Sequence, residues 1–132
     1  MKKWLALLCA GLWVFCACGK EKETTGGYTA ISQEIAQKMM AEDEGYIIVD
    51  VRTEKEYREG HIPGAICIPN DTIRNRMPKD LPDFHQEILV YCRSGSRSKD
   101  AAQKLADLGY TNVYEFGGIL TWNGEVVKEP EP

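Results

Sequence analysis

The sequence predicts an α/β domain with a central, mainly parallel five-stranded sheet and helices on both faces. Short apolar, β-branched segments alternate along the chain with segments whose apolar residues recur at helical spacing. Several of the short segments are apolar on both faces, as at residues 88–91, which is typical of buried parallel strands. They span roughly one hundred residues, a length that suits one domain with one core.

Each element follows from a local pattern. Ser32 is expected to cap a first helix that runs to about residue 41. Thr53 and Glu56 form a capping box that opens a second, short helix, which Gly60 ends. One helical turn is expected at 71–76, a longer helix at 99–108, and a short final helix that carries Trp122. The five expected strands are 28–31, 46–51, 65–68, 88–91 and 112–114.

The segment from Cys92 to Ser98 joins the fourth strand to the helix after it. In such a loop the backbone N–H groups can converge on one point, and the helix N-terminus adds partial positive charge. A lone cysteine after a strand is usually an inert core residue. Here one glycine, three serines and two arginines follow Cys92, a lining that suits an anion and a reactive thiolate. The pattern therefore predicts a nucleophilic Cys92.

Three segments carry a resemblance to a known family. Cys92 is separated from Arg97-Ser98 by four residues, as in the active-site loop of rhodanese-like sulfurtransferases. The family's N-terminal signature is similar to Ile48-Val49-Asp50-Val51-Arg52 together with Glu56 to Ile66. Its C-terminal signature is similar to Gly117-Gly118-Ile119-Leu120-Thr121-Trp122. The resemblance covers about Tyr28 to Gly124 and implies a rhodanese-like fold with Cys92 as the catalytic residue.

The resemblance also implies roles for the other loop residues. Arg97 closes the loop and either binds an anionic sulfur donor or braces the loop, and both interpretations stay open. Arg93 is expected on the rim, where it would attract a donor such as thiosulfate or remain a solvated surface arginine. The remaining members of the predicted substrate-binding loop are Ser94, Gly95, Ser96 and Ser98, whose backbone or hydroxyl groups would bond the sulfur.

Asp50 and Arg52 match a charged pair of the family signature that orders the neighbourhood of the active loop. A structural salt bridge is the favoured interpretation of this pair. His61 is expected to be structural rather than a general base, because a thiolate with a low pKa needs no base.

Loop length separates two enzyme classes that share this fold. Rhodanese-like sulfurtransferases have four residues between Cys and Arg, and the related dual-specificity phosphatases have five. This chain has four, from Arg93 to Ser96. The tighter ring suits a single sulfane sulfur, so the spacing disfavours a phosphatase.

The implied function is transfer of a sulfane sulfur from a donor such as thiosulfate, through a Cys92 persulfide, to a thiol or cyanide acceptor. No cofactor is expected. No metal is expected either, because His61 and His85 have no partners at ligand spacing. The alternative is a non-catalytic sulfur-carrier or protein-binding module that hands the sulfur to a protein acceptor.

The N-terminal residues 1–17 are expected to be a secretory signal peptide, with Lys2 and Lys3 before an uncharged, mostly apolar run. The run ends in Phe15-Cys16-Ala17-Cys18, which resembles a bacterial lipoprotein cleavage box except that Phe15 stands where Leu is usual. Lipidation at Cys18 is therefore expected. An uncleaved membrane anchor helix is the alternative.

These signals divide the chain and place it in the cell. Residues 18–27 are expected to be a flexible tether, 28–126 the domain and 127–132 a C-terminal tail. The mature protein would be a membrane-anchored lipoprotein outside the cytoplasm, in the periplasm or at the cell surface. Loss of Lys2 and Lys3 would change the formal net charge from −4 to −6. This acidic balance argues against nucleic-acid binding and leaves membrane association to the acyl chains.

Cysteine usage fits a thiol enzyme rather than a disulfide scaffold. Cys9 and Cys16 would leave with the signal and Cys18 would carry lipid, so only Cys67 and Cys92 remain in the domain. Cys67 is expected to pack in the core. A disulfide between Cys67 and Cys92 is the alternative.

Overall fold

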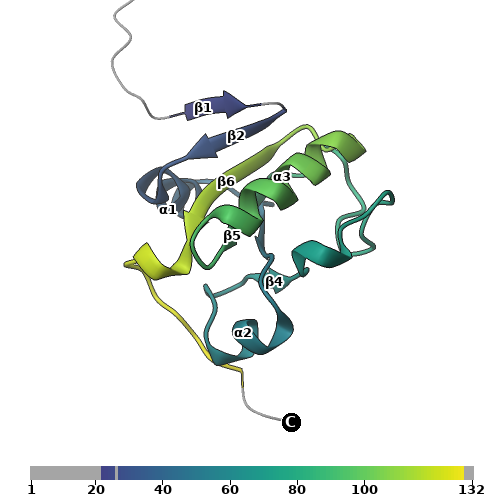
Figure 1. The fold of residues 1–132 in the computed structure, drawn as a ribbon. Coiled ribbons are helices and arrows are strands. Elements are labelled where there is room, and N and C mark those ends of the chain that lie inside the picture. The colour runs from purple at the N-terminus through teal and green to yellow at the C-terminus, as the bar shows by residue number, and fades with distance from the viewer. Residues whose placement is uncertain (1–21, 26, 130–132) are drawn as a thin grey trace, which may run out of the picture.

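A computed structural model describes residues 22–25 and 27–129 of the chain. Its centre is a single sheet in the order β1-β2-β6-β5-β3-β4 (Figure 1). Five of these strands, from β2 to β4 across the sheet, are parallel, and β1 pairs antiparallel with β2. The strands are β1 (Lys22–Thr25), β2 (Tyr28–Ile31), β3 (Ile47–Asp50), β4 (Ile66–Cys67), β5 (Ile88–Cys92) and β6 (Val113–Gly118). The predicted five-stranded parallel sheet is confirmed, with β1 as an addition at its edge.

The helices begin where the capping residues place them. Ser32 accepts the Ile35 N–H at 3.1 Å to start α1, and Thr53 accepts the Glu56 N–H at 3.2 Å to start α2. Gly60 ends α2, as the sequence predicts. The helical elements are α1 (Gln33–Glu42), α2 (Glu54–Glu59), η1 (Asn70–Thr72), α3 (Ser96–Leu108) and η2 (Ile119–Thr121).

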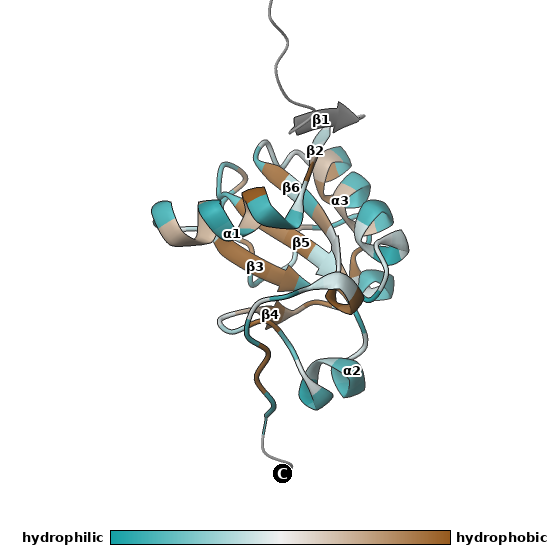
Figure 2. Cartoon of the chain, turned by 90° about the vertical axis from the view of Figure 1, so that its left-hand side faces the viewer, coloured by the Kyte–Doolittle hydropathy of each residue, from teal (hydrophilic) through white to brown (hydrophobic). Residues whose placement is uncertain are grey.

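The core has two layers because the strands are apolar on both faces. Residues of β5 alternate between them: Ile88, Val90 and Cys92 join the cluster that includes α3, whereas Leu89 and Tyr91 join the cluster that includes α1. Figure 2 shows apolar residues concentrated in the central strands, with hydrophilic residues on the outer helical surfaces. This alternation puts the Cys92 side chain on the α3 face of the sheet.

Two boundaries differ from the expected division of the chain. Strand β1 lies within the segment 18–27 that the sequence suggests to be a tether, and four of its residues pair with β2 instead. At the other end, Val127 exchanges two backbone hydrogen bonds with His61, both at 2.9 Å, so the chain still contacts the domain after residue 126. The predicted signal peptide and Cys18 lie outside the described residues.

Candidate active site

The predicted loop lies at the carboxyl end of β5. Cys92 is the last residue of β5, and α3 begins at Ser96, three residues earlier than the sequence suggests. The early start arises from Gly95, which adopts φ 108° in the left-handed region and turns the chain directly into the helix. Arg97 and Ser98 therefore belong to the first turn of α3, and the connecting loop is only Arg93 to Gly95.

Cys92 Sγ is enclosed by polar groups from this turn. The Gly95 N–H donates to Sγ at 3.0 Å, and Ser98 Oγ lies 3.3 Å from it. The thiol is 1% exposed, and burial by itself raises its pKa. Hydrogen bonds from the Ser98 hydroxyl and from the N–H groups of Ser98, Gly95 and Ser94 outweigh that effect, so the pKa of Cys92 is lowered. The loop thus favours a thiolate.

The glycine pair of β6 makes room for the loop. A Cβ on Gly118 would collide with the carbonyl group of Arg93, so only glycine permits this approach. Gln33 of α1 donates to the Gly118 carbonyl at 2.8 Å, and the Leu120 N–H donates to the Arg93 carbonyl at 3.2 Å. Segments far apart in sequence therefore hold the loop in place.

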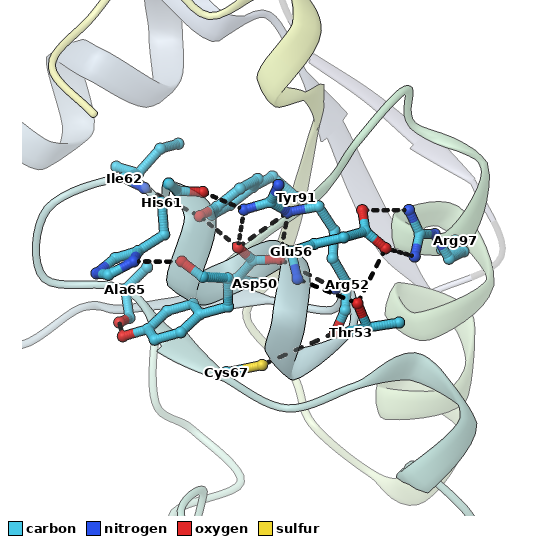
Figure 3. A network of polar contacts seen from close by, with 12 residues as sticks. Asp50, Arg52, Thr53, Glu56, His61, Ile62, Ala65, Cys67, Tyr91 and Arg97 are labelled. Carbon is cyan, nitrogen blue, oxygen red and sulfur yellow. Dashed lines mark hydrogen bonds and ion pairs between the residues drawn. The ribbon is translucent and has the colours of Figure 1, made fainter. Parts of the chain in front are cut away.

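Arg97 is held by a carboxylate of α2. Its guanidinium makes two hydrogen bonds to Glu56, at 2.8 and 3.0 Å, as Figure 3 shows. These bonds, opposed by partial burial, lower the pKa of Glu56 to about 2. In this structure Arg97 braces the loop against α2, which is one of the two roles that the resemblance left open, and its partner is a carboxylate.

Asp50 and Arg52 form a buried ion pair beside the loop. Arg52 donates to Asp50 at 2.6 to 3.1 Å and to the Gly60 carbonyl at 2.6 Å. The Tyr91 hydroxyl donates to Asp50 at 2.8 Å (Figure 3). Tyr91 immediately precedes Cys92, so the pair positions the end of β5 and has the structural role that the sequence favours.

Comparison with known proteins agrees with this geometry. The Rhodanese-like domain family matches residues 32–125. A sulfurtransferase of Allochromatium vinosum is 36% identical over 107 residues, which cover 76% of this chain and 95% of that protein. The chain belongs to the rhodanese-like family.

Two further relatives carry the names of a thiosulfate sulfurtransferase and a rhodanese. The thiosulfate sulfurtransferase PspE of Escherichia coli (strain K12) is 37% identical over 71 residues, covering 54% of this chain and 68% of that protein. A solved structure described as a rhodanese with anions from E. coli has a TM-score of 0.59 and 33% identity, and covers 64% of this chain and 99% of that chain. At the family level, this rhodanese-like protein is a sulfurtransferase-like enzyme.

An exposed arginine lies on the rim of the rhodanese loop. Arg93 is exposed, as the sequence suggests, and the side chains of Ser94 and Ser96 are exposed too, so among the three serines only Ser98 brings its hydroxyl to the sulfur. A pocket of about 310 Å³ lies beside the loop, with Arg93 and Arg52 in its wall. Its other lining residues are Glu56, Glu59, Gly60, Ile119, Leu120 and Val126.

The second cysteine of the domain is separate from the first. Cys67 and Asp50 are register partners, as are Asp50 and Tyr91, so two strand spacings of about 4.8 Å separate Cys67 from the end of β5. A disulfide needs Cα atoms closer than about 7 Å. Both thiols are free. Among the described residues, no group of acidic, histidine or cysteine side chains could hold a metal ion.

Two functional-site neighbours escape the sequence reasoning. Glu56 is visible in the sequence only as a capping residue, and its bond to Arg97 spans 41 positions. Glu115 of β6 is 3% exposed, and its Oε1 atom accepts from Ser98 Oγ at 2.7 Å and from the Gly117 N–H at 2.8 Å. The one local signal for Glu115 is an acidic residue in an otherwise apolar strand beside the glycine pair.

Proposed function

We propose that this protein transfers a sulfane sulfur from thiosulfate, through a persulfide on Cys92, to a thiol acceptor. The observation that carries the proposal is the environment of Cys92 Sγ. A buried thiol that receives the Gly95 N–H at 3.0 Å and has its pKa lowered by the surrounding turn is a prepared nucleophile.

In the first step, the Cys92 thiolate attacks the outer sulfur of thiosulfate. A new S–S bond forms, the S–S bond of thiosulfate breaks, and sulfite leaves with the electron pair. Arg93, exposed in the wall of the pocket, favours the approach of this dianion, whereas Asp50 balances the charge of Arg52. The solved E. coli rhodanese, described as holding anions, supports such a site.

In the second step, a thiolate or cyanide attacks the outer sulfur of the persulfide. The Cys92 thiolate then leaves and is again stabilised by the N–H groups of Ser94, Gly95 and Ser98. Because the same fixed donors stabilise the sulfur before and after transfer, the site needs little reorganisation between the steps.

A mass spectrum of the purified protein tests the proposal directly. Incubation with thiosulfate is expected to add the mass of one sulfur atom to the peptide that contains Cys92, and cyanide is expected to remove it. Cys92→Ser should accept no sulfur, and Cys67→Ser should behave like the parent protein. Sulfur mapped to Cys67 would overturn the assignment.

A protein acceptor is a second candidate for the second step. Leu120 is 63% exposed on the wall of the pocket beside Arg93, and its N–H bonds the Arg93 carbonyl, so an apolar contact surface adjoins the loop. Slow turnover with thiosulfate and a small thiol, combined with fast transfer to one protein, would favour this carrier function. Hydrolysis of an aryl phosphate would instead reopen the phosphatase alternative.

The proposed location is outside the cytoplasm, on a lipid anchor at Cys18. Its support is the sequence alone: the apolar run that ends in Ala17-Cys18 and the polar segment after it. None of the helices in the described residues has the length and apolar character that a membrane span requires. Incorporation of a labelled fatty acid that is lost in Cys18→Ser would support the anchor, and a label retained in that variant would refute it.

A further inference from the structure

Most of the charge around the pocket beside the loop is matched in pairs. Arg52 lines the pocket, and the buried Asp50, at 2.6 Å, balances its charge. Glu56 lines the pocket too, and its carboxylate is bonded to Arg97 at 2.8 and 3.0 Å. Neither pair therefore presents a net positive charge to a molecule in the pocket.

Two other charged residues line the pocket, and they have opposite signs. Arg93 and Glu59 are both exposed, and neither belongs to an ion pair within the described part of the chain. Water and salt screen exposed charges strongly. A doubly charged donor thus meets no excess of positive side chains in this pocket.

The contacts of Glu56 keep the loop arginine away from the donor. Both terminal nitrogens of Arg97 donate to Glu56, and Thr53 Oγ1 donates to the same carboxylate at 3.2 Å. The guanidinium of Arg97 is directed at this carboxylate in Figure 3, and Arg97 lines a separate hollow of about 230 Å³ that includes Asn70 and Asp71. Arg97 still interacts electrostatically with Cys92, so cancelling its charge matters at the sulfur.

The rest of the pocket wall is apolar. Leu120 and Val126 are 63% and 45% exposed, and both line the pocket together with Ile119. Its volume of about 310 Å³ holds a small organic molecule. Exposed apolar side chains beside a reactive sulfur suit an organic substituent better than an inorganic dianion.

We propose that Glu56 determines the charge of the sulfur donor by disfavouring donors with two negative charges. The inference rests on the proposed sulfur transfer and narrows its donor class to organic thiosulfonates and persulfides, in preference to thiosulfate. With a thiosulfonate, the Cys92 thiolate bonds the outer sulfur, the S–S bond of the donor breaks, and a sulfinate leaves with the electron pair. Glu56 touches no reacting atom and acts through charge, so it is a specificity-determining residue.

Two donors of nearly the same shape test this selectivity. Methanethiosulfonate has a methyl group where thiosulfate has an anionic oxygen, so the two differ by one charge. Glu56→Gln removes the carboxylate charge but keeps an oxygen for Thr53 and Arg97. It should raise kcat/KM for thiosulfate, relative to methanethiosulfonate, by about fivefold. The intrinsic reactivities of the donors cancel when the variant is compared with the parent protein.

Matched variants separate selectivity from a structural role. Arg97→Gln leaves the Glu56 charge without its partner and should change the ratio in the opposite direction, again by about fivefold. Glu56→Asp keeps the charge, and Glu54→Gln removes a charge from an exposed position of the same helix, so both should stay within about twofold of the parent ratio. If Glu56→Gln does not fold, Glu56→Met replaces it as an uncharged side chain of similar size.

Anion protection gives a second readout that needs no sulfur transfer. Sulfate and methanesulfonate differ by one charge and are unreactive, and each is tested for protection of Cys92 against iodoacetamide. In Glu56→Gln the sulfate concentration for half protection should fall about fivefold, while that of methanesulfonate stays the same.

Three results would overturn the inference: an unchanged donor ratio and sulfate protection in Glu56→Gln, the same change in Glu54→Gln, or equal losses with both donors. The third result would mean that Glu56 only supports the loop. Persulfide formation on Cys92 is measured separately by mass spectrometry. The selectivity can therefore fail while the proposed sulfur transfer is observed, and anion protection can show the selectivity where no persulfide forms.

Discussion

The ends of β4 and β5 offer a direct comparison, because each strand of the same parallel sheet ends in a cysteine. Cys92 ends β5 and Cys67 ends β4. Burial by itself favours the protonated form of both thiols. The segments after the two strands differ: β5 turns through Gly95 into α3, and β4 continues into Ile68, Pro69 and η1.

The two surroundings have opposite effects on the thiolate. Around Cys92, N–H groups and the Ser98 hydroxyl donate toward the sulfur and outweigh burial. Around Cys67, burial is reinforced by the negative charges of Asp50 and Glu54, and the pKa rises to about 11. Its thiol donates to the Arg52 carbonyl at 3.8 Å, a contact that stabilises the protonated form. A position at the end of a strand is thus not enough to make a cysteine reactive. The direction of the dipoles around the sulfur decides whether the thiolate is stabilised.

The largest expected effect is on catalysis. Cys92→Ser should lower thiosulfate turnover by at least about a thousandfold, because the nucleophile is lost. Cys67→Ser should keep turnover within about twofold, since Cys67 is remote from the loop. Steady-state assays of both variants test this pair, and a Cys67→Ser variant as impaired as Cys92→Ser would remove the basis of the comparison.

A second test compares the two thiols within one molecule. At pH 8 a thiol with a pKa of about 11 is ionised in roughly one molecule per thousand, so Cys67 should react very slowly with iodoacetamide. Cys92 should be alkylated first, by a factor of at least about one hundred in rate. Peptide mass spectrometry over a time course measures both sites, and the denatured protein, in which both should react alike, is the control.

The third test changes the backbone that makes the two strand ends different. Gly118→Ala should displace the Arg93 carbonyl and the N–H groups after it, because the added Cβ has no space. Turnover is expected to fall about ten- to a hundredfold, and the pKa of Cys92, measured from thiolate absorbance, should rise while that of Cys67 is unchanged.

Gly64→Ala is the matched control for that substitution. Gly64 has a left-handed backbone, at φ 83°, but a Cβ there meets no atom within 4 Å. Gly64→Ala should lower the free energy of unfolding by about 1 kcal/mol without changing turnover. Equal loss of activity in both variants would show that general destabilisation, rather than the loop, accounts for the effect.

Much of this site could be predicted because its chemistry lies in one short segment. Cys92 and its donors fall within seven residues, and the strand before them is apolar on both faces. The buried Asp50 and Arg52 pair could also be predicted, because both residues lie at the end of one strand. Local patterns suffice where the interacting groups are neighbours in sequence.

The rest depends on contacts between distant segments. Glu56 bonds Arg97 across 41 positions of the sequence, and Glu115 bonds Ser98 across 17. Pairs so far apart produce no local sequence pattern. The sequence places the start of α3 three residues late because the left-handed conformation of Gly95 replaces a side-chain cap. Strand β1 escapes the sequence analysis because its polar residues show no apolar alternation, and its pairing with β2 is made by the backbone.

The smallest expected effect concerns the bond between Glu56 and Arg97. This bond braces the loop after Cys92, and Cys67 lacks such a brace. The pKa of Glu56 in the folded protein is about 2, below its ordinary value of 4.5, so its bond to Arg97 stabilises the fold above about pH 4.5. That contribution is lost as the pH falls from 4.5 to 2. Glu56→Gln should therefore lower the free energy of unfolding near pH 7 by about 0.5–1 kcal/mol, a modest amount because both side chains are partly exposed. The difference from the parent protein should vanish near pH 2, as measured by urea unfolding across this range.

Glu59→Gln serves as the control, because Glu59 is an exposed carboxylate of the same helix. This substitution should change stability less. A Glu56→Gln deficit that persists at pH 2 would mean that the residue stabilises α2 through its cap rather than through Arg97.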